Sequence, residues 1–513
     1  MSGDLLAGAG VVVAAASAAA AILLPPSRWR AAAMLLALGL APLLVLADQW
    51  DSNQVADLRD SPRRLLVLTG GVAALTAALF ALFRRRPELF ALAVIATLPF
   101  RVPLHAGGDQ ANLLVPLYLV IAAGVAMAAV RDLGATGPIA PAAAHSRFPW
   151  LPRLLAAFVL LYAAQSLYSE DFSQGLQNAC FFFVPFSLAY VLLGEVSWSR
   201  RLLALALVVV LAEAIAFVLV GFAQYATREL LWNNAVIRSN EFHVYFRVNS
   251  LFWDPNVLGR YLAIAIVLAS AALLWTRARR LPLALGAVAV VLWLGLAITF
   301  SQSSFAALLA GLATLAALRW SLRWTAAVCA GAAVVAVTLA LAAGESLEVD
   351  LSTDDKVNKE TGGRANLVSG GVELFADRPV WGYGTGSFSP AFREHVAEGR
   401  APVSESHTEP VTVAAEQGLI GLAFFAALLA AAFAVLCAGL RGLMPGLQRG
   451  PPAKDADSTL TAARAAVLAA FIALLVHTIA YAGLFEDPIT WVLLAAGGAL
   501  AAGGREQPPA SAY

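Results

Sequence analysis

The sequence predicts an all-α protein that crosses a membrane many times. Hydrophobic residues make up 60% of the 513 residues and charged residues only 13%, a balance that excludes an ordinary soluble globular domain. Apolar runs recur along the chain, each long enough for a helix to cross roughly 30 Å of hydrocarbon, and they lack the two-residue alternation of a β-barrel. A net charge of +1 gives no sign of a nucleic-acid partner.

Fifteen apolar runs are candidate spans. They are residues 5–24, 31–47, 65–83, 89–104, 113–130, 151–168, 176–194, 202–225, 258–275, 282–300, 303–319, 323–343, 411–440, 459–483 and 488–503. We read about 12 of them as a core and about 3 as an N-terminal addition. The expected parts are additional N-terminal helices (1–88), a transmembrane core (89–343), a catalytic loop (344–410), C-terminal transmembrane helices (411–503) and a cytoplasmic tail (504–513).

The loop 344–410 is the longest polar segment, with twelve acidic and six basic residues. Lys and Arg gather in the short connections on the other side, for example at Arg84 to Arg86 and at Arg200 and Arg201. Because basic residues collect in short cytoplasmic loops, this pattern places the large loop on the extracytoplasmic face. Short amphipathic helices are expected in this loop. The three cysteines all lie in apolar runs, so neither a disulfide framework nor a metal site is expected.

Charged groups close to the membrane on the loop side are candidates for function, because burying them in hydrocarbon is costly. Three of them, Arg247, Asp254 and Arg260, lie with the polar Asn256 within fourteen residues around the start of the run 258–275. An arginine there suits a phosphate through its planar fork. An interfacial anchor paired with Asp254 is the alternative interpretation.

A second candidate interrupts an apolar run with Ser301, Gln302, Ser303 and Ser304, which predicts a tight helical hairpin. The free N–H groups at the start of its second helix suit an anion. An ordinary serine-capped turn is the alternative.

The helix expected after Arg364 carries the apolar residues Val368, Val372 and Phe375 on one stripe. It should therefore lie on the membrane surface with that stripe facing the lipid. Arg364 would then bind a pyrophosphate at the level of the lipid headgroups. Alternatively, its side chain only extends to the interface to keep its charge in water. The glycine-rich run containing Gly384 follows no strand, so it indicates a turn more than a phosphate cradle.

His407, with Glu405 before it, stands a few residues ahead of the run 411–440. A neutral imidazole can accept a proton from a hydroxyl, a role worth ~10² to 10⁴ in rate. A neighbouring carboxylate such as Glu405 is the alternative proton acceptor. A solvated loop histidine is the plainer interpretation. Glu416 lies within the apolar helix that follows, which favours a supporting role in the site.

Five motifs stand in an order that resembles the O-antigen ligase and polymerase superfamily. They are RVNSLFWDPN, TFSQSSFAALLAG, GRANLVSGGVELFADRPVWGYGTGSF, SHTEPVTVAAEQGLIGL and HTIAYAGLFEDPITWVLL. The resemblance covers roughly residues 240–500, and the two loop motifs are the specific ones. Members have about twelve spans with the large periplasmic loop before the last three, and three spans follow the loop here.

The resemblance implies a glycosyltransferase of the cytoplasmic (inner) membrane that works on its outer face, with inversion and without a metal or other cofactor. Its donor would be a polyprenyl-pyrophosphate-linked glycan, its acceptor a surface glycan or lipid-linked glycan, and membrane lipids would surround it. Arg247 and Arg364 match arginines that bind the donor pyrophosphate in this family, and His407 matches the histidine of the final loop motif.

Three positions depart from the family pattern. Thr408 stands where an asparagine is usual, Gln302 where the hairpin usually carries an arginine, and no tryptophan lies near Leu367. A transporter of a small anion such as bicarbonate, or of a lipid-linked glycan, is the alternative function. Transporters carry polar residues near mid-membrane on broken helices, whereas the polar groups here cluster at one surface.

Overall fold

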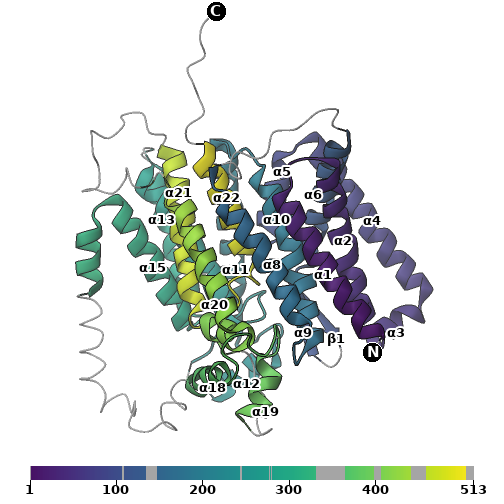
Figure 1. The fold of residues 1–513 in the computed structure, drawn as a ribbon. Coiled ribbons are helices and arrows are strands. Elements are labelled where there is room, and N and C mark those ends of the chain that lie inside the picture. The colour runs from purple at the N-terminus through teal and green to yellow at the C-terminus, as the bar shows by residue number, and fades with distance from the viewer. Residues whose placement is uncertain are drawn as a thin grey trace, which may run out of the picture.

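The computed structural model describes residues 2–106, 109–134, 147–242, 245–276, 278, 280–330, 364–397, 406–438, 440 and 458–503. These residues form a bundle of apolar helices (Figure 1). The segments long and apolar enough to cross a membrane are α1 (Ser2–Leu23), α2 (Arg28–Asp48), α4 (Pro62–Arg85), α6 (Val115–Gly134), Phe172–Gly194, α11 (Arg200–Thr227), α13 (Pro255–Trp275), α15 (Gln302–Arg319), α20 (Glu409–Leu436) and α21 (Ser458–Thr478). The prediction of an all-α polytopic membrane protein is therefore confirmed.

The remaining helices are shorter. Phe172–Gly194 consists of α9 (Phe172–Asn178), the π-helical turn η1 (Ala179–Phe183) and α10 (Val184–Gly194). Further apolar helices are α5 (Glu88–Thr97), α8 (Trp150–Ser166), α14 (Leu281–Ala297) and α22 (Pro488–Gly503). The other short helices are α3 (Asn53–Arg59), α12 (Asn234–Phe242), α18 (Arg364–Asp377) and α19 (Phe388–His395). Each predicted run contains a helix. In the run 323–343 the helix is described only as far as residue 330, and the rest of that run and the tail 504–513 lie outside the described residues.

The run 89–104 does not form the continuous helix that we expected. Its helix α5 has ten residues and is therefore about 15 Å long, half of what a bilayer core requires. Strands β1 (Val102–Ala106) and β2 (Asp109–Leu113) follow it and pair antiparallel, with Val102 opposite Leu113. Pro99 and Pro103 explain the break, because neither residue has the N–H that a continuing helix needs.

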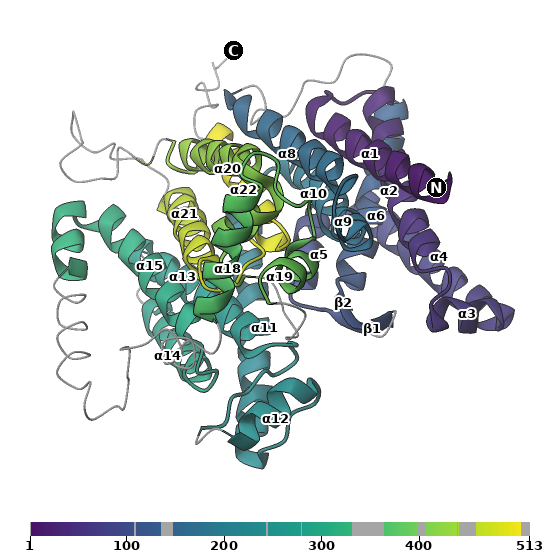
Figure 2. The same cartoon turned by 60° about the horizontal axis from the view of Figure 1, so that its bottom comes forward.

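The first two helices are built into the bundle. Helix α1 packs against α2, α8 and α10, and α2 packs against α6. Arg30 of α2 is buried and pairs with Asp132 of α6 at 2.7 Å and with Glu195, which follows α10, at 2.5 Å. A buried arginine is tolerated when such partners neutralise it. Helix α4 lies at the edge of the bundle (Figure 2), where Phe83 is its buried residue.

Helices α12, α18 and α19 all lie at one end of the bundle, the lower end in Figure 1. We call this the loop end, and we call residues 364–397 the loop segment. A small apolar core of its own holds this segment to α20: Leu374, Tyr383, Phe388, Ala391, Phe392 and Ala415. The candidate residues described below all belong to the segments that meet here.

Candidate functional site

Arg247 is fixed where α13 begins. Asp254 caps this helix by accepting the N–H of Asn256 at 2.6 Å, and Pro255 occupies the first turn, as expected for a helix start. The Nε of Arg247 donates to the carbonyl of Thr299 at 2.9 Å, and one terminal nitrogen donates to Asn256 Oδ1 at 3.1 Å. The half-buried guanidinium is thereby oriented at the junction of α13 with the turn before α15.

That turn brings buried hydroxyl groups to the same place. Ser301 caps α15 and lies 2.7 Å from Ser304, whose hydroxyl donates to the carbonyl of Asn256 at 3.3 Å. Ser303 is buried with its Oγ 3.3 Å from Nε2 of His477. Gln302, by contrast, is exposed. The structure therefore places Ser303, and not Gln302, in the buried cluster.

Arg260 enters this region as half of an ion pair. It lies one turn along α13, is 5% exposed, and pairs with Asp487 at 2.7 Å. Asp487 also begins α22, where its other oxygen accepts the N–H of Ile489 at 2.8 Å. Arg101, which follows α5, interacts electrostatically with both Asp487 and Arg260. The chain thus gathers two arginines around one carboxylate.

His407 lies in a tight turn directly before α20. Its φ of 59° is left-handed, a conformation in which histidine is found more often than most residues. The hydroxyl of Ser406 accepts the N–H of Thr408 at 3.1 Å and lies 2.7 Å from Thr412. These contacts hold the backbone on both sides of the imidazole. Thr408, at the position where the family usually has asparagine, is the first residue before the helix.

The link between α21 and α22 is held against the start of α20, beside this histidine. The carboxylate of Glu409 accepts the N–H groups of Gly483 at 2.5 Å and Leu484 at 3.1 Å. Tyr481 is held nearby, with its ring 6.0 Å from that of His407 and 5.7 Å from that of His477. The ring centroid of one tyrosine therefore lies within 6.0 Å of both histidine ring centroids.

The charges around His407 favour its neutral form. Burial lowers the pKa of His407, the positive charge of Arg364 lowers it further, and Asp254 opposes them in part. Burial likewise lowers the pKa of Arg247, Asp254 raises it, and Arg364 lowers it. Arg247, Arg364, Asp254 and His407 therefore share one electrostatic environment. It combines guanidinium groups, which bind phosphate oxygens, with an imidazole that is ready to accept a proton.

Arg364 is the first residue of α18, and the packing of α18 fixes its place. A side chain at Gly370 would meet the ring of Phe392 at 2.3 Å, and one at Gly371 would meet Val411 at 2.4 Å. The two glycines therefore allow α18 to lie close against α19 and α20. In the stripe that we expected to face the membrane, Val372 is 53% exposed, whereas Val368 and Phe375 are partly buried. The contact of this stripe with lipid stays a prediction.

The glycine-rich run forms the turn between α18 and α19. Gly384 has a φ of 95°, and a Cβ there would lie 2.3 Å from the Cα of Ser169, so only glycine fits. Both oxygens of Glu416 accept backbone N–H groups of this turn, from Gly386 at 3.0 Å and Phe388 at 3.1 Å. Because a carboxylate occupies these N–H groups, the run is a turn held by Glu416 and not a phosphate cradle.

Glu405 lies outside the described residues. The structure adds His477, Tyr481, Asp487 and Arg101 to the candidates that we singled out. All four lie in or beside predicted apolar runs. An ionisable residue in such a run is a signal of function, and that signal could have identified them.

The comparison with known protein families agrees with the motifs. Residues 287–426 match the family model described as O-antigen ligase. The match includes Arg364 and His407, and it lies within the range 240–500 that carries the resemblance. No curated protein matches the chain. Over residues 287–426 the chain is thus similar to the O-antigen ligase family, which confirms its resemblance to the O-antigen ligase and polymerase superfamily.

Proposed function

We propose that this membrane glycosyltransferase of the O-antigen ligase type takes a polyprenyl-pyrophosphate-linked glycan as its donor. The glycan passes to a hydroxyl of a surface glycan or lipid-linked acceptor. One observation carries the proposal. A half-buried histidine with a lowered pKa shares its electrostatic environment with Arg364 and Arg247, so a proton acceptor and an anion-binding pair occur together.

The reaction follows from these groups. The acceptor oxygen forms a bond to the anomeric carbon as the bond from that carbon to the pyrophosphate oxygen breaks. The leaving pyrophosphate keeps the electron pair, and Arg247 and Arg364 stabilise its growing negative charge. His407 takes the proton from the acceptor hydroxyl. Because the attack is direct, the configuration at the anomeric carbon inverts.

The remaining polar groups position this machinery. Asn256 and the carbonyl of Thr299 orient the Arg247 guanidinium. The Arg260–Asp487 pair joins α13 to the start of α22, and Tyr481 packs against His407. Fixed geometry of this kind lowers the reorganisation that the transition state requires.

The location of the site supports an enzyme on the outer face of the cytoplasmic membrane. Ser303, His407 and Asp487 lie immediately before or at the first turn of α15, α20 and α22, and the Arg247 side chain reaches Asn256 in the first turn of α13. The basic short connections of the sequence lie on the other side. A lipid carrier would therefore reach the arginines from the headgroup region. The transporter alternative needs polar groups near mid-membrane, and this clustering does not favour it.

The test is glycan transfer in a null strain that carries the wild type, Arg364→Ala, Arg364→Lys or His407→Ala at matched membrane levels. We expect surface glycan to be lost in all three variants while the lipid-linked precursor accumulates. Arg393→Lys on the exposed face of α19 is the matched control and should transfer normally. Unchanged surface glycan in Arg364→Ala and His407→Ala would refute the proposal.

A further inference from the structure

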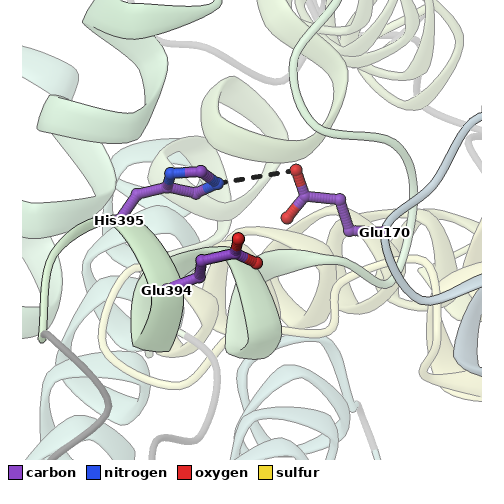
Figure 3. Close-up of side chains that lie close together, drawn as sticks. All are labelled: Glu170, Glu394 and His395. Atoms are coloured by element: carbon purple, nitrogen blue, oxygen red, sulfur yellow. Dashed lines mark ion pairs between the residues drawn. The ribbon is translucent and has the colours of Figure 1, made fainter.

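A second group of ionisable side chains lies away from the proposed site. Glu394 and His395 end α19, and Glu170 lies in the link between α8 and α9. Their ligand atoms all lie within 4.8 Å of one another, and His395 Nε2 is 3.6 Å from Glu170 Oε1. Figure 3 shows the three side chains directed toward a common point from two separate segments.

We propose that Glu170, Glu394 and His395 bind one divalent transition-metal ion, with zinc as the best fit. One imidazole nitrogen and two carboxylates form a mixed set that suits zinc better than magnesium or calcium. The 3.6 Å between the His395 nitrogen and the Glu170 oxygen supports this. Bonds of about 2.1 Å from each atom to one ion would enclose an angle of roughly 120°, close to tetrahedral.

Neighbouring side chains restrict the histidine ring and Glu170. The ring of Tyr383 lies 5.0 Å from that of His395, and its hydroxyl donates to Asp377 at 2.6 Å. Arg378 stacks 4.0 Å over the same tyrosine and lies 3.3 Å from Glu170. Arg378 pairs with the same Glu170 oxygen that faces His395, so an ion would bind in place of this contact or through the second oxygen of Glu170. All three ligand residues are exposed, so an ion can reach them from solvent.

The ion would act as a clamp. Glu170 belongs to the α8–α9 link, whereas Glu394 and His395 belong to the loop segment that also carries Arg364. A shared ion would tie this segment to the helix bundle. The clamp is independent of the proposed transfer, whose chemistry uses arginine and histidine.

Zinc binding to the purified full chain in lipid nanodiscs tests this directly, with a purification tag that contains no histidine. A chelator first removes any bound metal, and zinc is then added back. We expect calorimetry and elemental analysis to give one zinc per chain, and Tm to rise. Magnesium at the same concentration should leave Tm unchanged. A metal ion that binds the folded protein and not the unfolded chain raises the free energy of unfolding. Zinc binding by calorimetry and the rise in Tm must therefore agree.

Two variants separate a metal site from a simple ion pair. Glu394→Gln should weaken zinc binding at least tenfold and abolish the rise in Tm, and His395→Gln should do the same. Glu373→Gln, exposed on α18, is the matched control and should bind like the wild type. Undiminished zinc binding by Glu394→Gln would overturn the proposal. So would an unchanged Tm in wild type with zinc.

Discussion

The ring of Tyr481 lies 6.0 Å from that of His407, although the two residues belong to different segments. Tyr481 follows α21, His407 precedes α20, and the Glu409 carboxylate ties the two segments together through the N–H groups of Gly483 and Leu484. The position of the proposed base therefore depends on the link between α21 and α22 as well as on its own turn.

Replacing Tyr481 tests this dependence. Tyr481→Ala removes the ring that packs on His407, and we expect transfer to fall by about 10-fold or more because a displaced base loses its alignment. Tyr481→Phe keeps the ring and should retain most of the activity. Transfer by purified protein, with Tm measured alongside, is the assay. Equal losses in both variants would show that the hydroxyl, and not the ring, matters.

The lowered pKa of His407 predicts the acid side of the pH profile. Burial and then Arg364 lower this pKa below the ordinary value of about 6.5. A base must be neutral, so transfer should persist at pH 6.5 and decline only at lower pH, as the imidazole gains its proton. The dependence of kcat/KM on pH measures this limit. A decline that begins above pH 6.5 would contradict the assignment.

Arg364 should contribute to that shift. Removing its charge in Arg364→Gln raises the pKa of His407, because a neighbouring cation no longer opposes protonation. The variant loses donor binding, so the readout is the pH at which diethyl pyrocarbonate modifies half of the His407 peptide, followed by mass spectrometry. We expect this pH to increase in Arg364→Gln and to stay the same in Arg393→Gln.

The buried pair of Arg260 and Asp487 predicts a double-mutant result. Asp487→Asn can still cap α22 but leaves Arg260 buried without its counter-charge, which costs about 3 to 5 kcal/mol. The double variant Arg260→Met with Asp487→Asn removes both charges, so it should recover much of the lost Tm. A double variant as unstable as Asp487→Asn alone would show that the pair's charge is not the cause.

Glu416→Gln probes the turn that contains Gly384. The carboxylate accepts two backbone N–H groups, whereas an amide offers a single acceptor oxygen and leaves one donor unsatisfied, at a cost of about 1 to 3 kcal/mol. Hydrogen exchange of residues 382–388 should become faster, with α13 unaffected. Equal exchange in the variant and the wild type would rule out this role for Glu416.

Most helices could be predicted because each apolar run reports its own length and ends. Phe172–Gly194 and α13, for example, begin and end within a few residues of the predicted runs. The hairpin after α5 was missed because Pro103 argues against a strand, although the Gly107–Gly108 dipeptide is typical of hairpin turns. One residue of this short segment argues against a strand and another pair favours a hairpin, so the local sequence alone does not decide between them.

The site was predicted only in part, for a different reason. Arg247, Arg364 and His407 lie in polar segments, where charged residues are easy to single out. Asp487 could not be paired with Arg260 from the sequence, because only the packing of α13 beside α21 and the α21–α22 link brings them together. The sequence indicates where a helix begins and ends, but the packing of the folded chain determines which helices become neighbours.

The ion cluster of Arg30 has a consequence for how the chain is made. Its partner Glu195 is synthesised 165 residues later, which at 5 to 20 residues per second means a wait of roughly 10 to 30 s. Asp132 is made 102 residues after Arg30, so before that point the arginine of α2 lacks both partners, and until Glu195 is made it still lacks one. The first helices therefore cannot lock into place when they emerge from the ribosome, and the final assembly of the N-terminal part must await α10.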